Sequence, residues 1–246
     1  MRAWGVCLLL LLLWQSPLRA DELLLLTEEA PPTSFLRDGL PDGYAVEVVR
    51  ELIRRTGSRA HVELLPWTRA YSKAKSEANT GLFLVVRTAE REALFQWVGP
   101  ILRGSTRFYS LKDSGLQVDS LEQAASAGTI AMPKQWYTYE TLQRMGFDNL
   151  YGAAGPRQMV TMLKHGRVKL IATEDLTLRE ELASGGLTPE EVQAHMVFMR
   201  SDHYIVFSPQ TEPALVERWR HELDGMRHDG SLRSILARWL PGATMP

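Results

Sequence analysis

Cysteine is almost absent from this chain, and its scarcity excludes several kinds of chemistry. The 246 residues contain one cysteine, Cys7, which lies within an apolar stretch near the N-terminus. We expect this stretch to be removed from the mature chain. The remaining residues would then offer no thiol for a disulfide, an iron–sulfur cluster, a cysteine-ligated zinc ion or a nucleophile.

Other chemical signatures are missing as well. The six histidines form no pair at a metal-ligand spacing such as His-x-x-x-His. The sequence has no Gly-x-Ser-x-Gly motif and no phosphate-binding glycine loop, so it predicts no metal and no cofactor. A net charge of −1 leaves no positive excess for nucleic-acid binding. The content of 45% hydrophobic and 23% charged residues is typical of a folded globular chain.

The N-terminus has the pattern of a secretory signal peptide. Arg2 supplies a positive charge, Trp4–Trp14 is apolar, and small and polar residues lead to Ala20. We predict a signal peptide over residues 1–20, cleaved after Ala20. The apolar run is too short to span a membrane, although an uncleaved anchor is the alternative. Export and the absence of cysteine together suit the bacterial periplasm.

Strand-like and helix-like segments alternate through the rest of the chain, which predicts an α/β fold with parallel strands. Predicted strands cover Leu23–Thr27, Val62–Leu65, Gly81–Val86, Phe108–Lys112, Thr129–Met132, Val168–Thr173, Met196–Met199 and His203–Ser208. Predicted helices cover Tyr44–Thr56, Pro66–Ala78, Leu121–Ser126, Thr138–Met145, Arg157–His165, Leu176–Ala183, Glu212–His228 and Ser231–Trp239. Several of these helices end at glycine, as helices often do.

Three segments together carry a resemblance to a known family. Glu29–Glu51 has two prolines, a glycine loop and an amphipathic helix. Gly81–Ile101 has a buried strand, then Thr-x-x-Arg, then an aromatic segment that ends in Gly-Pro. His228–Leu240 opens with Asp-Gly-Ser and forms a final helix. In this order and spacing the chain resembles the family 3 extracellular solute-binding proteins, which are periplasmic amino-acid-binding components of importers.

The resemblance implies a type II periplasmic binding protein fold, in which two α/β lobes face a cleft and are joined by two crossing hinge strands. Lobe 1 would comprise residues 21–107 and 201–246, and lobe 2 residues 108–200. The crossings would fall near Phe108–Lys112 and Val197–His203. Ligand binding would close the cleft by a hinge motion.

The resemblance also implies ligand contacts from the Thr-x-x-Arg motif, Thr88 and Arg91. The arginine would bind the α-carboxylate of the ligand, because a guanidinium group matches a carboxylate with two hydrogen bonds. A surface arginine paired with Glu90 or Glu92 is the alternative, and Arg87 is close enough in sequence to substitute.

Glu174 follows the predicted strand Val168–Thr173, and strand ends line the crevice of open α/β sheets. By resemblance it would bind the α-ammonium group of the ligand, with Asp175 as a competitor. The alternative is an acidic residue stabilised by the dipole of the following helix. Glu29 is also expected in the site.

Departures from the family pattern alter the expected pocket. Ala30 replaces an aromatic residue, Leu84 and Val86 replace small hydroxyl residues, and Gln135–Tyr137 replaces a Gly-Thr-Thr-like helix start. Trp67, Trp136 and Tyr137 are predicted as aromatic walls of the pocket, although aromatic residues more often belong to the core.

The sequence therefore predicts a monomeric periplasmic protein, not an enzyme, that captures a small polar or zwitterionic, amino-acid-like solute. Its partner would be an ABC permease in the inner membrane. One alternative is an enzyme resembling periplasmic cyclohexadienyl dehydratases, with Glu174 as the catalytic acid. Another is a sensory binding domain that works without an importer. Sequence alone does not identify the ligand.

Overall fold

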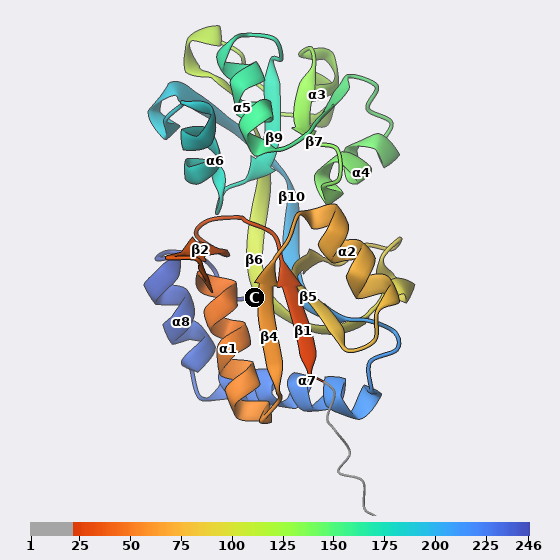
Figure 1. The fold of residues 1–246 in the computed structure, drawn as a ribbon. Helices are drawn as coiled ribbons and strands as arrows, with labels where there is room; N and C mark the ends of the chain where they lie inside the picture. The colour runs from red at the N-terminus through yellow and green to blue at the C-terminus, as the bar shows by residue number, and fades with distance from the viewer. Residues whose placement is uncertain (1–21) are drawn as a thin grey trace, which may run out of the picture.

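The computed structural model describes residues 22–246, so the predicted signal peptide and Cys7 lie outside the described residues. Figure 1 shows two α/β lobes, one above the other, connected by two long central strands. These strands are β6 (Gln96–Leu111) and β10 (Val192–Phe207). In this described part, no helix combines the length and apolarity needed to cross a bilayer.

One sheet of eight strands runs through both lobes in the order β4-β1-β5-β10-β6-β9-β7-β8. Strands β4, β1 and β5 are parallel in lobe 1, and β9, β7 and β8 are parallel in lobe 2. In the middle, β10 pairs antiparallel with both β5 and β6, and β6 with β9. The outer strands are β1 (Leu23–Thr27), β4 (Ala60–Leu64), β5 (Thr80–Val86), β7 (Ile130–Pro133), β8 (Leu150–Ala153) and β9 (Leu170–Glu174).

Lobe 1 consists of strands β1 to β5, one end of β6 and β10, and four helices. The helices are α1 (Tyr44–Thr56), α2 (Trp67–Ser76), α7 (Pro213–His228) and α8 (Ser231–Trp239). In α1 the apolar residues recur at helical spacing, so Val46, Val49 and Leu52 all point into the core and are fully buried. Gly57, with φ of 66°, ends this helix in a left-handed conformation that glycine adopts without strain.

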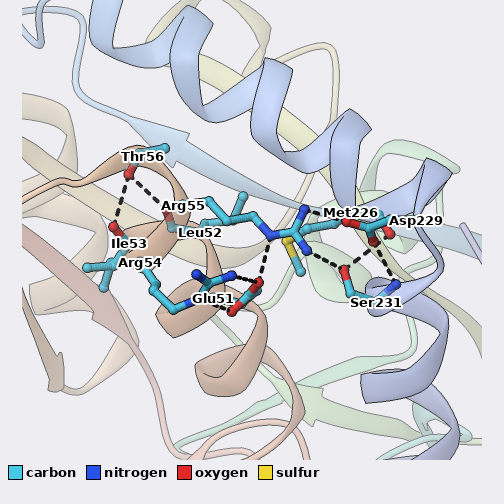
Figure 2. A network of polar contacts seen from close by, with 9 residues as sticks. All are labelled: Glu51, Leu52, Ile53, Arg54, Arg55, Thr56, Met226, Asp229 and Ser231. Atoms are coloured by element: carbon cyan, nitrogen blue, oxygen red, sulfur yellow. Dashed lines mark hydrogen bonds and ion pairs between the residues drawn. The ribbon is translucent and has the colours of Figure 1, made fainter.

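A polar network joins α1 to the turn between α7 and α8, far along the sequence (Figure 2). Arg55 contacts Glu51 on its own helix at 2.6 Å and Asp229 in the turn at 2.7 Å. Arg55 also donates a hydrogen bond to Ser231 at 3.0 Å. This network attaches the C-terminal helices to the N-terminal half of lobe 1.

Lobe 2 consists of β7, β8 and β9, the other end of β6 and β10, and four helices. The helices are α3 (Leu121–Ser126), α4 (Tyr137–Arg144), α5 (Pro156–Lys164) and α6 (Leu178–Gly185). Its buried side chains form a core of their own, separate from the two hydrophobic clusters of lobe 1. Each lobe is thus stabilised by its own apolar contacts, and β6 and β10 are the strands shared by both.

The structure differs from the predicted strands mainly in β10 and β6. Strand β6 begins at Gln96, well before the strand predicted over Phe108–Lys112. The two strands predicted over Met196–Met199 and His203–Ser208 are one continuous strand, whose pairing with β6 is interrupted by register shifts. These irregularities and the polar Arg200–Asp202 segment obscure the alternation that a long strand would show. The hairpin strands β2 (Phe35–Arg37) and β3 (Leu40–Asp42), and strand β8, were not predicted. The lobe boundaries at 107/108 and 200/201 stay a prediction.

Candidate functional site

A small cavity of about 80 Å³ lies between the two lobes. Lobe 1 supplies residues that follow the ends of β1 and β5, and lobe 2 supplies the end of β9 and the first turns of α4 and α6. Its lining residues are Glu28, Ala30, Thr33, Trp67, Leu84, Val86, Arg91, Leu102, Trp136, Tyr137, Thr138, Thr173, Glu174, Thr177, Glu181 and His203. Ends of parallel strands are the usual binding position in open α/β sheets.

Arg91 lines this cavity and is almost fully buried, with 3% of its surface exposed. Its guanidinium group lies over the rings of Trp67 and Tyr71, at 5.5 and 5.4 Å from their centroids. The same group contacts Glu140, on α4 of the other lobe, at 3.0 Å. Arg91 is therefore not the surface arginine of the alternative interpretation, and its charge is already compensated across the interlobe boundary.

The alternative partners of Arg91 are taken by other groups. Glu92 pairs with Arg87 at 2.5 Å, and Glu90 pairs with Arg144 at 2.9 Å. Because Arg87 is exposed and is not part of the cavity wall, it does not substitute for Arg91.

Glu174 ends β9 and is paired within the protein. Its Oε1 atom accepts a hydrogen bond from Tyr137 at 2.6 Å and from His203 Nε2 at 2.9 Å. Burial raises the pKa of Glu174, but the charge of His203 and the two hydrogen bonds outweigh burial and hold this pKa below its ordinary value. Burial likewise lowers the pKa of His203, and Glu174 reverses that effect and raises it. The two side chains form a buried ion pair of carboxylate and imidazolium.

Tyr137 connects this ion pair to the central strands. Its hydroxyl lies 2.8 Å from Thr106 on β6 and accepts a hydrogen bond from Ser201 on β10 at 3.0 Å. Burial, followed by the nearby negative charge of Glu174, raises the pKa of Tyr137, which keeps its hydroxyl protonated as a donor. The network therefore ties helix α4 to both strands that join the lobes.

Two further carboxylates, Glu28 and Glu181, face the cavity, and neither forms an ion pair with a residue in the described range 22–246. Glu28 follows β1 in lobe 1, and Glu181 lies in the first turn of α6 in lobe 2. Glu181 accepts hydrogen bonds from Thr173 and Thr177, each at 2.6 Å. Burial raises the pKa of Glu181 to about 7. Burial, and then repulsion by Glu181, raises the pKa of Glu28 to about 7.

A local distortion of β5 places Leu84 in the cavity wall. The pairing with β10 joins Val85 to Tyr204 and Phe83 to Ile205, which leaves Leu84 as an extra, unpaired residue. Leu84 has φ of 66°, a left-handed conformation that costs a leucine free energy. Such bulges redirect side chains and often lie beside functional sites. Here the bulge puts an apolar side chain where the family pattern has a small hydroxyl residue.

The predicted site residues fall into two groups. The cavity wall includes Arg91, Glu174, Trp67, Trp136 and Tyr137. Glu29 and Thr88 are not part of it.

Glu29 is exposed, and its neighbour Glu28 faces the cavity instead, because successive side chains of extended backbone point to opposite sides. Thr88 accepts the backbone hydrogen bond of Arg91 with its carbonyl oxygen at 3.1 Å, and its buried hydroxyl has no hydrogen-bond partner within residues 22–246. Asp175 binds the backbone N–H of Ser105 at 3.2 Å, away from the cavity.

Sequence reasoning missed Glu28, Glu181, His203 and Glu140. The position of Glu28 directly after the first strand was a usable signal, because strand ends line the crevice. Glu140, Glu181 and His203 carried no local signal, since their roles depend on contacts between segments far apart in sequence. No cluster of His, Cys, Asp and Glu suited to a metal ion is present among residues 22–246.

The sequence and the fold both resemble those of known proteins. The profile of the bacterial extracellular solute-binding proteins, family 3, matches residues 24–242. No curated protein sequence matches the chain.

Solved structures share the fold at low identity. A histidine kinase sensor domain with similarity to periplasmic binding proteins has a TM-score of 0.83 at 18% identity, covering 92% of this chain and 98% of that one. A periplasmic His/Glu/Gln/Arg/opine family-binding protein from Silicibacter pomeroyi, in complex with lysine, has a TM-score of 0.76 at 18% identity, covering 91% and 100%. A protein of glutathione import via GshT and the cystine importer TcyBC of Streptococcus mutans has a TM-score of 0.75 at 16% identity, covering 92% and 97%. These likenesses confirm the predicted type II periplasmic binding protein fold.

Proposed function

This chain belongs to the bacterial extracellular solute-binding proteins, family 3, and from that premise we propose that it captures a small polar or zwitterionic, amino-acid-like solute between its lobes. The observation that carries the proposal is the buried cavity, whose wall combines charged side chains from both lobes. A solute in that position would contact both lobes at once, so its binding energy would favour the closed arrangement.

Contacts between the lobes support a closing motion. Arg91 of lobe 1 pairs with Glu140 of lobe 2, and Glu90 of lobe 1 pairs with Arg144 of lobe 2. Both acidic partners are partly exposed, so these pairs can break and re-form as the lobes separate and approach. Strands β6 and β10 run through both lobes and connect them, which suits a hinge.

In this proposal the protein works in the periplasm as a monomer and delivers its solute to an ABC permease in the inner membrane. The signal-peptide pattern over residues 1–20 supports export. Family membership and the import protein from Streptococcus mutans support an importer partner. Transport of the captured solute by vesicles that contain a candidate ABC permease from the same organism tests that partnership.

Binding itself is tested by thermal unfolding and small-angle scattering with amino acids, amines and organic acids. We expect at least one solute to raise the melting temperature and reduce the radius of gyration. Ala30→Trp should abolish both responses, because it fills the cavity, whereas Ala125→Trp on an exposed face of α3 should leave them intact. Circular dichroism verifies that both variants fold. If no solute gives a response, and native mass spectrometry finds none bound, the proposed function is wrong.

A sensory binding domain is the second candidate, and one observation favours it. The histidine kinase sensor domain has the highest TM-score among the three structures described above, 0.83. Such a domain would use the same cleft and the same closing motion, with a signalling partner in place of a permease. A kinase whose activity changes when the liganded protein is added would favour this candidate.

The dehydratase-like enzyme has less support. A catalytic acid must hold a proton near neutral pH, and the ion pair with His203 holds the pKa of Glu174 below its ordinary value. An absorbance assay for phenylpyruvate formation from prephenate tests this alternative directly.

A further inference from the structure

The polar groups that line the cavity separate into those that are already compensated and those that are not. Arg91, the residue expected to bind a ligand carboxylate, is paired with Glu140 at 3.0 Å. Glu174, the residue expected to bind a ligand ammonium group, is paired with His203 at 2.9 Å. Both groups that would recognise the α-amino and α-carboxylate groups of an amino acid therefore have internal partners of opposite charge.

Glu28 and Glu181 differ from these pairs. Within residues 22–246, no lysine, arginine or histidine forms an ion pair with either carboxylate. The two side chains come from opposite lobes and line the same cavity, so their negative charges repel each other when both are ionised. Glu181 is 8% exposed, and its hydroxyl partners Thr173 and Thr177 are neutral, so no positive charge offsets its burial.

A positive charge placed between these carboxylates would relieve their repulsion and repay the cost of burying them. The remaining wall favours the same kind of occupant. Trp67 and Trp136 line the cavity, and aromatic rings attract cations, although the Trp67 ring already lies against the Arg91 guanidinium group. Leu84 and Val86 contribute apolar contact for a short carbon chain.

We propose that the solute is a small organic cation without a carboxylate group, whose ammonium or guanidinium group binds between Glu28 and Glu181. This inference rests on the proposed solute-binding function, and it replaces the amino-acid-like, zwitterionic solute with a polar cationic one. Glu140 takes the place that a ligand carboxylate would occupy at Arg91, so a carboxylate on the solute would have to displace an existing ion pair.

Matched pairs of solutes test the inference, because each pair differs only in the α-carboxylate. The purified protein is titrated by calorimetry at pH 8 with two such pairs, cadaverine with lysine and agmatine with arginine. Glutamine and glutamate, which have no cationic side chain, are titrated separately as controls. We expect the better amine to bind at least tenfold more tightly than its matched amino acid, and we expect no binding of glutamine or glutamate. Tighter binding of lysine and arginine than of their amines, or no binding of either amine, overturns the inference.

Variants identify the side chains that recognise the cationic solute. Glu181→Gln should weaken amine binding at least tenfold, and Glu51→Gln on the surface of α1 should leave it unchanged. If Glu181→Gln does not fold, Glu28→Gln serves the same purpose. Glu140→Gln releases Arg91 and should raise the affinity for lysine relative to cadaverine. Amine binding that is unchanged in both Glu28→Gln and Glu181→Gln overturns the inference.

The failure of this inference is distinguishable from the failure of the proposed function. Binding of an amino acid in the cavity, abolished by Ala30→Trp, would contradict the cationic solute class and leave the solute-binding function intact. Absence of any bound solute, as described above, would contradict the function itself.

Discussion

Two groups of acidic residues in this protein show opposite behaviour, although they have similar chemistry. At the junction of α1 with α7 and α8, hydrogen bonds from Arg54, followed by those from Arg55, lower the pKa of Glu51 to about 2 (Figure 2). In the cavity, burial raises the pKa of Glu28 and of Glu181 to about 7. Glu51 at the junction has two arginine partners, whereas neither cavity carboxylate forms an ion pair within residues 22–246.

The difference indicates that the two groups of carboxylates have different roles. A carboxylate that already has its cation within the protein contributes to the fold and offers little to a solute. A buried carboxylate that lacks a cation costs stability in the absence of a solute, and such a cost persists most often at functional sites. Glu174 belongs with the compensated group despite its position in the cavity, because His203 supplies the cation.

The largest effect that would test this comparison is the loss of a compensating cation. His203→Ala leaves Glu174 buried without its partner, so we expect the free energy of unfolding to fall by about 3 kcal/mol. Urea denaturation at pH 7 measures it. The matched control is His61→Ala, an exposed histidine on β4, with an expected change below about 0.5 kcal/mol. Equal effects of the two substitutions would show that the ion pair with Glu174 is not stabilising.

The next effect is the pH dependence of stability in the solute-free protein. Because the pKa of Glu28 and of Glu181 is about 7 in the folded chain and ordinarily 4.5, the folded state binds more protons than the unfolded state between these values. The free energy of unfolding should therefore fall as the pH rises from 4.5 to above 7, by about 3 kcal/mol per carboxyl.

The double variant Glu28→Gln/Glu181→Gln isolates this contribution. His203 also loses its stabilising proton as the pH rises through its raised pKa, so the wild-type slope contains both effects. We expect the double variant to have a flatter profile than the wild type between pH 5 and 7. Parallel profiles would mean that the two carboxyls are ionised throughout this range.

A smaller effect concerns the binding of a cationic solute. The solute binds the ionised carboxylates, so its affinity should rise with pH from 6 to 8, by up to tenfold per pH unit if one proton is released. Arg91, Glu174, His203 and Tyr137 also face the cavity. His203 loses its proton as the pH rises, which leaves the site more negative and favours a cation in the same direction as ionisation of the carboxyls. Calorimetry with cadaverine at several pH values measures the dependence. An affinity that falls with pH would contradict the assignment.

The smallest effect is expected at the junction shown in Figure 2. Glu51→Gln removes a partner of both Arg54 and Arg55 in a partly exposed network, so we expect a loss of less than about 1 kcal/mol, further reduced by salt. Urea denaturation at low and high ionic strength measures it. If the free energy of unfolding fell as much as in His203→Ala, the carboxylates at the junction and in the cavity would not differ in the way described here.

Local patterns predicted most of the fold. Helix α1, for example, follows from the spacing of its apolar residues and the glycine that ends it, and the structure has the predicted bounds Tyr44–Thr56. The long strand β10 was predicted as two strands, because its register shifts and polar middle depend on pairing with β5 and β6 rather than on its own residues. Short strands at sheet edges carry too few residues for a pattern.

The predicted site residues stay a prediction, and the structure places only some of them in the cavity wall, for the same reason. Arg91 and Glu174 were identified by motif and position, and both lie in the cavity wall. Their partners Glu140 and His203 belong to segments distant in sequence, so the compensation of both charges was not foreseeable. We predicted Glu29 as a site residue, but its neighbour Glu28 faces the cavity. Which of two successive side chains points toward the cavity depends on how the preceding strand packs, and the sequence alone does not give this.

The sequence by itself determined the α/β pattern, the family and the segments that reach the cleft, because periodicity and turn residues act over short distances. Only the tertiary structure decided which charges meet. An ion pair or an unpaired carboxylate depends on contacts and burial that arise when distant segments pack together, and these set whether Arg91 and Glu174 are free for a solute and whether Glu28 and Glu181 need one.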